Sequence, residues 1–294
     1  MTIASLGVER RTRSLAGRIW RWFDGDWLFL GAVIALSTIA ILGLIAPHLP
    51  LADPELPVPE DRLQPPSWSH PFGTDVNGSD ILSRVIYAPR VDLLIAILSV
   101  LLALAFGSVI GLFGTFFQGR GGIAGLLTEL LNRTMDILQS FPAFIVALAL
   151  AGVVGSDLWS VIGVLTFLFT PIFFRFVRGE VLHIRERLFI EAQTAAGSPL
   201  WRVLLVNVSR NSVGAAVVQA SPTMGFAILL TAGLAFLGVG VKPPTPEWGL
   251  MISSGQEQLY VGRWWPAIFP GMAIAITVFS LAVVGEALRR RLEQ

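Results

Sequence analysis

The chain has 294 residues, of which 54% are hydrophobic and only 14% are charged. Soluble domains carry about 25% charged residues, so this composition argues against a soluble protein and favours a membrane protein. Cysteine is absent, which excludes disulfide bonds, thiolate catalysis and cysteine-ligated metals. The formal net charge is +1, and Lys242 is the only lysine. Because Pro243 follows it, the sequence contains no GxxxxGK[ST] phosphate-binding loop.

The first 46 residues predict a cytoplasmic arm followed by a transmembrane helix. Residues 1–26 carry arginines interleaved with tryptophans, side chains that favour the headgroup layer of a membrane. The apolar run Trp27–Ala46 is long enough to span a bilayer. We expect this run to be retained rather than cleaved as a signal peptide, because no small-residue cleavage site follows it.

A Pro-rich stretch, Pro47–Pro89, holds half of the 18 prolines and predicts an extracytoplasmic loop. Beyond it we expect a five-helix core over residues 90–288 and a cytoplasmic tail over residues 289–294. A second outer loop, Lys242–Arg263, precedes the last span. The five spans of the core are predicted at Leu93–Phe117, Leu130–Val154, Leu158–Phe174, Val213–Val241 and Trp264–Val284.

Several residues in these spans indicate how they pack and bend. Gly107, Gly111 and Gly114 in the second span predict close approach of a neighbouring helix. Pro142 lies inside the third span, and Pro222 predicts a kink or break in the fifth.

Two charged residues, Arg133 and Asp136, stand one helical turn apart at the start of the third span. An ionisable residue at membrane depth is costly and often functional. Here we favour the simpler interpretation, in which the two side chains form an i,i+3 ion pair near the membrane interface.

The distribution of basic residues predicts the orientation of the chain. With six spans and an inner N-terminus, 16 of the 21 Lys and Arg residues lie in inner segments and 5 in outer ones. Inner loops of membrane proteins carry such an excess, and the inverted topology would place it outside. We therefore expect an all-α, multi-pass protein of the cell inner membrane with six transmembrane helices and both termini in the cytoplasm.

The sequence contains no recognisable catalytic or metal-binding pattern. The histidines are His48, His70 and His183, and no HExxH, GxSxG or clustered carboxylate set accompanies them. A secondary transporter driven by protons or sodium usually buries carboxylates in mid-span, and none is predicted here. We therefore expect a transport subunit that is not an enzyme, binds no cofactor and takes its energy from a partner.

The polar stretch Arg185–Asn211 is the segment on which such a partner could act. Residues Arg185–Ala196 contain good helix formers and neither Gly nor Pro. Gly197 stands where a helix C-terminus favours a positive φ. Ser198 can cap a second helix that has Pro199 at its first position. The stretch therefore predicts a cytoplasmic helical hairpin, longer than the roughly 2–8 residues of ordinary bundle connections.

This hairpin resembles the EAA motif of permease subunits in binding-protein-dependent ABC importers. The motif reads Glu-Ala-Ala, three residues, Gly, then about ten residues and Ile-Leu-Pro-Asn. Glu191, Ala192, Gly197 and Asn211 match it, and Val208 stands for Ile. The departures from the motif are Gln193, Ser209 and Arg210.

Three other stretches resemble the dipeptide/oligopeptide/nickel subfamily of these permeases, and specifically its second (C-type) subunit. They read HPFGTDVNGSDILSRVIYAPRVDLLI, MDILQSFPAFIVALAL and AFLGVGVKPPTPEWGLMI. The first has Ser79 where the subfamily usually has Arg. Together with the hairpin, they extend the resemblance from about Pro47 onward.

The resemblance implies a type I importer permease that forms a translocation path for di- or oligopeptides by alternating access. Its implied partners are a homologous second permease, two cytoplasmic ATPase subunits that hold ATP and Mg, and an extracytoplasmic solute-binding protein. No nucleic acid is expected. In this family the hairpin is the coupling helix, which docks on an ATPase subunit. Its implied docking residues are Glu191, Ala192, Gln193, Gly197, Ser198 and Pro199.

The outer loops would face the solute-binding protein. The expected contact residues are Pro243, Pro244, Pro246, Glu247 and Trp248, with the equal alternative that they only brace the loop. Substrate alternatives are nickel chelates, glutathione-like peptides, and oligosaccharides or opines. Two further alternatives, of different classes, are a self-sufficient secondary transporter and a membrane scaffold that does not transport.

Overall fold

A computed structural model describes residues 26–116, 118, 122–155, 157–199, 202–203 and 208–292. Within these ranges the secondary structure is helical, and the β pairing consists of a single bridge between Thr74 and Asp80. The elements, in chain order, are α2 (Trp27–Ile45), η1 (Ala46–His48), η2 (Pro59–Asp61), α3 (Ile81–Tyr87), α4 (Pro89–Phe116), α5 (Ile123–Ser140), α6 (Ala143–Val154), α7 (Leu158–Arg185), α8 (Leu188–Ala195), α10 (Ser209–Phe236), α11 (Trp248–Leu259) and α12 (Trp265–Leu292).

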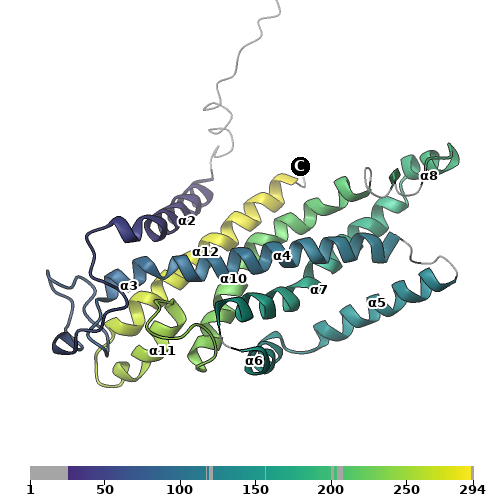
Figure 1. The fold of residues 1–294 in the computed structure, drawn as a ribbon. Helices are drawn as coiled ribbons and strands as arrows, with labels where there is room; N and C mark the ends of the chain where they lie inside the picture. Colours follow the sequence, from purple (N-terminus) through teal and green to yellow (C-terminus); the bar gives the residue numbers. More distant parts are fainter. Residues whose placement is uncertain are drawn as a thin grey trace, which may run out of the picture.

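The long helices α4, α7, α10 and α12 form a bundle, with α2 packed on α12 and α5 beside α7 (Figure 1). The loop from Leu49 to Asp80, α3 and α11 gather at one end of this bundle, and α8 projects from the opposite end. Following the predicted orientation, we call these the outer end and the cytoplasmic end. The predicted outer loops and the predicted hairpin thus lie at opposite ends of the molecule.

Five helical segments of the described chain are long and apolar enough to cross a membrane, at Trp27–His48, Ile81–Thr115, Leu158–Arg185, Ser212–Phe236 and Trp265–Arg291. A sixth crossing requires counting the pair α5 and α6, which is bent by 97°. The prediction of one continuous third span over Leu130–Val154 is therefore wrong. Pro142 has no backbone N–H and disfavours the helical conformation at Phe141, which is extended (φ −86°, ψ 142°).

The fifth predicted span, by contrast, continues as a single helix through its proline. Helix α10 runs unbroken over 28 residues with Pro222 inside it, so the predicted break is absent. The neighbouring helix α12 accommodates the proline ring, because a Cβ at Gly285 would lie 2.7 Å from Pro222 Cδ. The hydroxyl of Ser221 donates to the carbonyl of Leu281 on α12 at 2.6 Å. Contacts with α12 thus hold this part of α10.

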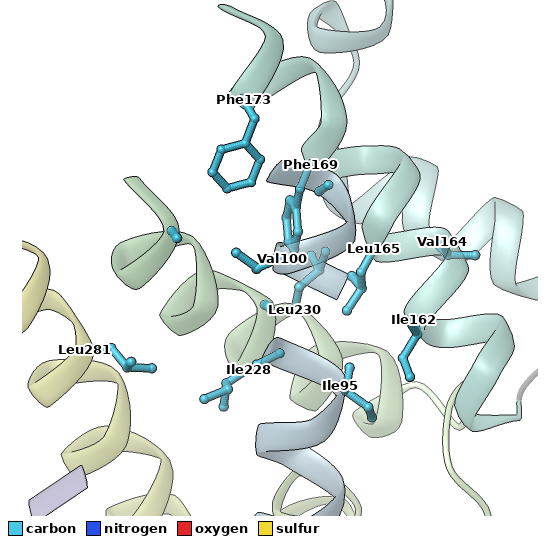
Figure 2. Close-up of a cluster of buried hydrophobic side chains, with 14 of the residues drawn as sticks. Ile95, Val100, Ile162, Val164, Leu165, Phe169, Phe173, Ile228, Leu230 and Leu281 are labelled. Carbon is cyan, nitrogen blue, oxygen red and sulfur yellow. The ribbon is translucent and has the colours of Figure 1, made fainter. Parts of the chain in front are cut away.

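The core lies between α4, α7 and α10 and consists of interleaved aliphatic and aromatic side chains (Figure 2). In a bilayer, helices associate through close packing rather than through the hydrophobic effect. The predicted close approach in the second span is confirmed at Gly107 and Gly111, which face α7. A Cβ at Gly107 would lie 2.7 Å from the Thr170 carbonyl oxygen, and one at Gly111 would lie 3.0 Å from that of Phe174.

The charged pair predicted within the third span has a different partner. Asp136 on α5 lies 3.5 Å from Arg175 on α7, and both side chains are at least half exposed. The expected pairing with Arg133 is therefore replaced by a contact between helices. The ion pair joins α5 to α7, whereas an i,i+3 pair would have stabilised α5 alone.

Candidate functional site

The cytoplasmic end carries the predicted hairpin, of which the structure describes the first helix and the turn. Helix α8 begins at Leu188, and two residues separate it from the end of α7, so the predicted helix over Arg185–Ala196 is split between α7 and α8. Gly197 has φ +78°, as its position predicted. Ser198 N donates to Gln193 O at 3.0 Å, which is the hydrogen bond that closes a Schellman cap.

The turn that follows α8 is short and open to solvent. Gly197 and Pro199 are exposed, Ser198 is half-buried, and a Cβ at Gly197 would meet no atom within 4 Å. The backbone N–H groups of Arg202 and Val203 both donate to Pro199 O, and these are hydrogen bonds of the helical type.

The start of the hairpin, before α8, is fixed to the bundle by Arg185. Its Nη1 donates to the carbonyl oxygens of Thr115 at 2.9 Å and Gln118 at 3.2 Å. The last carbonyls of a helix have no intrahelical partner, and a cation there also interacts favourably with the helix dipole. Arg185 therefore joins the C-terminus of α7, next to α8, to the C-terminus of α4.

Part of the predicted site lies outside the described residues. Glu191 and Ala192 belong to α8, but their side chains are not described, and neither are those of Arg210 and Asn211. Residues 200–201 and 204–207 of the predicted second hairpin helix are also outside the description. The docking role of all six predicted residues stays a prediction.

The outer end is organised by the stretch that follows His70, through side chains that reach across the loop. His70 Nδ1 lies 3.0 Å from Asp80 Oδ1, and Asp80 Oδ2 accepts from Ser83 N at the start of α3. Buried Arg84 lies 3.7 Å from Asp75 and donates to the carbonyl of Pro54 at 2.9 Å. This loop is therefore folded on itself.

A second outer contact joins the loop to the last span. Trp265 Nε1, on α12, donates to the carbonyl of Thr74 at 3.2 Å, and Thr74 is fully buried. The rings of Phe72 and Phe269 stack beside this contact, with centroids 4.0 Å apart and an interplanar angle of 4°. The loop and α12 thus form one packed unit.

The predicted contacts with a solute-binding protein divide into exposed and buried residues. Pro243 and Pro244 are exposed, whereas Pro246 is buried and the side chains of Glu247 and Trp248 are each 1% exposed. Glu247 caps α11, accepting from Gly249 N at 2.9 Å and Leu250 N at 2.6 Å. For these three buried residues the structure favours the bracing alternative, because a soluble partner cannot reach them in this conformation.

Burial raises the pKa of the Glu247 carboxyl, although its two backbone donors oppose that shift. Asp92, in the first turn of α4, is buried beside it and accepts from Trp248 N at 3.2 Å. Trp248 Nε1 donates in turn to the carbonyl of Val85 on α3, also at 3.2 Å. The three residues therefore connect α3, α4 and α11.

Sequence reasoning missed Asp92 and the anchoring role of Arg185. The local signal for Asp92 was an acidic residue in the first turn of a helix, which is common. Its contact with Trp248 spans 156 residues, and the Arg185 contact with Thr115 spans 70. Contacts between residues so far apart along the chain produce no periodic pattern that a single sequence could reveal.

The profile of one family, described as the binding-protein-dependent transport system inner membrane component, matches residues 104–294. The chain belongs to this family. This inner-membrane permease is 34% identical to the dipeptide transport system permease protein of Alkalihalophilus pseudofirmus over 266 residues. The alignment covers 90% of this permease and 85% of the relative.

Two other similar permeases cover most of the chain. The permease is 33% identical to the di/tripeptide transport system permease protein of Pseudomonas aeruginosa, with 93% of this chain and 90% of the relative covered. It is 30% identical to the glutathione transport system permease protein of Pectobacterium atrosepticum, with 99% and 95% covered. The resemblance to ABC importer permeases of peptide systems is thereby confirmed.

A solved structure supports the fold. A chain of the MetNI methionine ABC transporter in an inward-facing conformation matches with a TM-score of 0.59 and 18% sequence identity. The match covers 72% of this permease and 97% of that chain. It confirms the predicted type I importer permease fold.

Proposed function

We propose that this permease forms half of the translocation path of an ATP-driven importer for di- or oligopeptides. A homologous second permease supplies the other half, and two cytoplasmic ATPase subunits hold ATP and Mg and perform the hydrolysis. An extracytoplasmic solute-binding protein delivers the peptide to the outer end. The names of the relatives from Alkalihalophilus pseudofirmus and Pseudomonas aeruginosa favour peptides as the substrate.

The observation that carries this proposal is the exposed turn at Gly197. It follows α8, which projects from the cytoplasmic end (Figure 1), and Arg185, at the end of α7 just before α8, is hydrogen-bonded to the end of α4. A push on a short, capped helix that is fixed to two spans moves those spans as rigid bodies. The turn is therefore suited to receive the motion of an ATPase subunit and to convert it into alternating access.

The test is reconstituted transport. The permease is assembled with the second permease and the ATPase subunits in vesicles that enclose ATP, and the binding protein with a labelled dipeptide is added outside. Uptake is expected only when every subunit and ATP are present. Uptake by this chain alone would indicate a secondary transporter. No uptake by the complete assembly, with a binding protein loaded with its own ligand, would refute the proposal.

A second candidate substrate is a glutathione-like peptide. The permease from Pectobacterium atrosepticum, which is named for glutathione transport, aligns over 99% of this chain. Competition between labelled dipeptide and unlabelled glutathione in the same vesicles distinguishes the two substrates, provided that the binding protein is varied in parallel. The mechanism at Gly197 is the same for both.

A further inference from the structure

The outer end contains a cavity of about 640 Å³ that is lined by charged side chains of both signs. It lies between the segment that follows α2, the junction of α3 and α4, and the residues just before α11. Asp53 and Glu55 line it from the first of these segments, and Arg90 lines it from the first turn of α4. Sites for small molecules measure roughly 300–1,000 Å³, so this cavity has the size of a ligand site.

The opposite charges around this cavity do not neutralise each other. Within the part of the chain that the structure describes, the guanidinium of Arg90 and the carboxylate of Glu55 form neither an ion pair nor a hydrogen bond. The carboxylate of Asp53 accepts a backbone hydrogen bond from Glu55 N at 2.9 Å, but it has no cation as a partner in the described chain. The cavity therefore leaves a cation and two anions available to a ligand that carries both charges.

The acidic wall of the cavity is held in place by buried donors from α3. Ser83 Oγ donates to the carbonyl of Ala52, and Ser83 is fully buried. Buried Arg84 donates to the carbonyl of Pro54 at 2.9 Å. The backbone is thus fixed on both sides of Asp53. A wall that is already ordered loses less conformational entropy when a ligand binds.

The remaining surface of the cavity suits the other parts of a small polar molecule. Tyr87, at the end of α3, is half-buried and supplies a hydroxyl group that can donate or accept. Leu51, Val91 and Pro246 add apolar surface. A few polar groups on an otherwise apolar wall are typical of sites that orient a ligand.

We propose that this cavity binds a short peptide as a zwitterion. Arg90 binds the peptide's carboxylate, for which the planar guanidinium offers two parallel donors. Asp53 and Glu55 bind its ammonium group. At about pH 7 a free dipeptide carries both charges. The choice of a peptide rests on the proposed function, and the cavity would then hold the peptide at the outer end before it enters the translocation path.

The experiment measures the Kd of three peptides for the purified complex of both permeases and the ATPase subunits in nanodiscs, by calorimetry at low ionic strength. ATP and the solute-binding protein are left out, so that only the transporter can bind. The probes are Ala-Ala, its C-terminal amide and its N-acetyl derivative. Ala-Ala should bind best, and loss of either terminal charge should raise Kd roughly tenfold, because each charge loses a charge-assisted hydrogen bond.

Variants assign each peptide charge to its side chain. Arg90→Gln should raise Kd for Ala-Ala roughly tenfold and leave Kd for the amide unchanged, because the amide has no carboxylate to lose. The double variant Asp53→Asn, Glu55→Gln should weaken Ala-Ala in the same way and leave the N-acetyl peptide unchanged. The matched controls are Arg62→Gln and Glu60→Gln, which remove exposed charges of the same loop outside the cavity. They should bind all three peptides as wild type does.

Absence of Ala-Ala binding, equal Kd values for the three peptides, or equal losses in Arg90→Gln and Arg62→Gln would overturn the proposal. Binding of phosphoethanolamine without binding of Ala-Ala would also overturn it, and would assign the cavity to a lipid headgroup. The assay needs neither ATP hydrolysis nor uptake, so the two proposals fail separately. Reconstituted uptake without peptide binding to the complex refutes this site alone, whereas binding without uptake refutes the proposed function alone.

Discussion

The two ends of this permease differ in whether their polar groups are buried or exposed. At the outer end, Asp75, Asp80, Arg84 and Trp248 are buried, and each contacts a partner within the same chain. At the cytoplasmic end, the turn at Gly197 is exposed, and a Cβ there would meet only open space. One end is held together by its own side chains, and the other presents a rigid turn outward.

This difference indicates where the permease depends on other subunits. Buried polar groups are stable only when their hydrogen bonds are made, and at the outer end Asp75, Asp80 and Trp248 make theirs within this chain. An exposed turn that is closed by a Schellman cap keeps its shape without tertiary contacts, and is therefore available to a partner. Substitutions at the outer end should lower stability, and substitutions at the cytoplasmic end should lower coupling.

The largest effect on stability is expected from Arg84→Ala. The substitution leaves Asp75 buried without its cation and removes the donor to Pro54 O, and breaking a buried pair costs about 3–5 kcal/mol. The melting temperature of the purified permease should fall by roughly 6 °C or more.

Arg62→Ala is the matched control for Arg84. Arg62 Nε also donates to a loop carbonyl, that of Val76 at 2.7 Å, but the bond is exposed. Its loss should cost about 1 kcal/mol or less. Equal effects of the two substitutions would show that burial at the outer end is not what stabilises it.

The sequence made the helices and their order predictable because apolar runs of sufficient length have few alternatives in a membrane. For that reason the predicted first span, Trp27–Ala46, closely matches α2, Trp27–Ile45. The bend at Pro142 and the continuity at Pro222 were not predictable, since tertiary contacts decide whether a helix bends at a proline or continues through it. At Pro222, Gly285 on α12 provides the space.

The next largest effect is expected from Gly197→Pro, acting on coupling. Proline fixes φ near −65° and cannot adopt the +78° of this turn, so the cap is lost. ATP-dependent uptake should fall at least about tenfold, equivalent to about 1.4 kcal/mol, while the chain still inserts in the membrane. Uptake and the amount of ATPase that co-purifies are the measurements.

Gly262→Pro is the control at the other end of the molecule. Gly262 has φ +81°, and a Cβ there also meets open space, so the local disruption is closely matched. The amount of co-purified ATPase should be unchanged. Loss of ATPase in both variants would mean that Gly197 acts through general instability rather than through docking.

The candidate site was predictable only in part, for reasons visible at single residues. Gly197 was found because a positive φ at a helix end favours glycine whatever surrounds it. The burial of Glu247 and Trp248 was not, because the residues that cover them lie elsewhere in the chain, Asp92 among them. Local backbone geometry leaves a sequence signal, and tertiary burial of a loop does not.

A smaller effect is expected from Arg185→Ala, which loosens the cytoplasmic end without removing the turn. It deletes the donors to Thr115 O and Gln118 O, so the C-terminus of α7, next to α8, loses its hydrogen bonds to the end of α4. Uptake per ATP hydrolysed should fall about threefold, because a hydrogen bond from a charged group contributes about 1.5–3 kcal/mol when buried and less at a part-buried site such as this one. Arg187→Ala, which removes only an exposed contact with His183, should leave this ratio unchanged. An equal loss in both variants would contradict the anchoring role of Arg185.

The smallest effect is expected from Asp136→Asn, between the two ends. Asp136 and Arg175 are at least half exposed, and exposed pairs contribute about 0.2–1 kcal/mol. In the purified permease alone, Asp136→Asn and Arg175→Ala should each change the free energy of unfolding by less than about 1 kcal/mol, and a double-mutant cycle should give a coupling of similar size. A coupling well above that range would refute the assignment of the pair as exposed.

If the coupling grows only in the assembled transporter, the second permease covers α5 and α7 at this pair, because burial strengthens an ion pair that water otherwise screens. The same cycle thus measures the pair and tests whether this face is an interface.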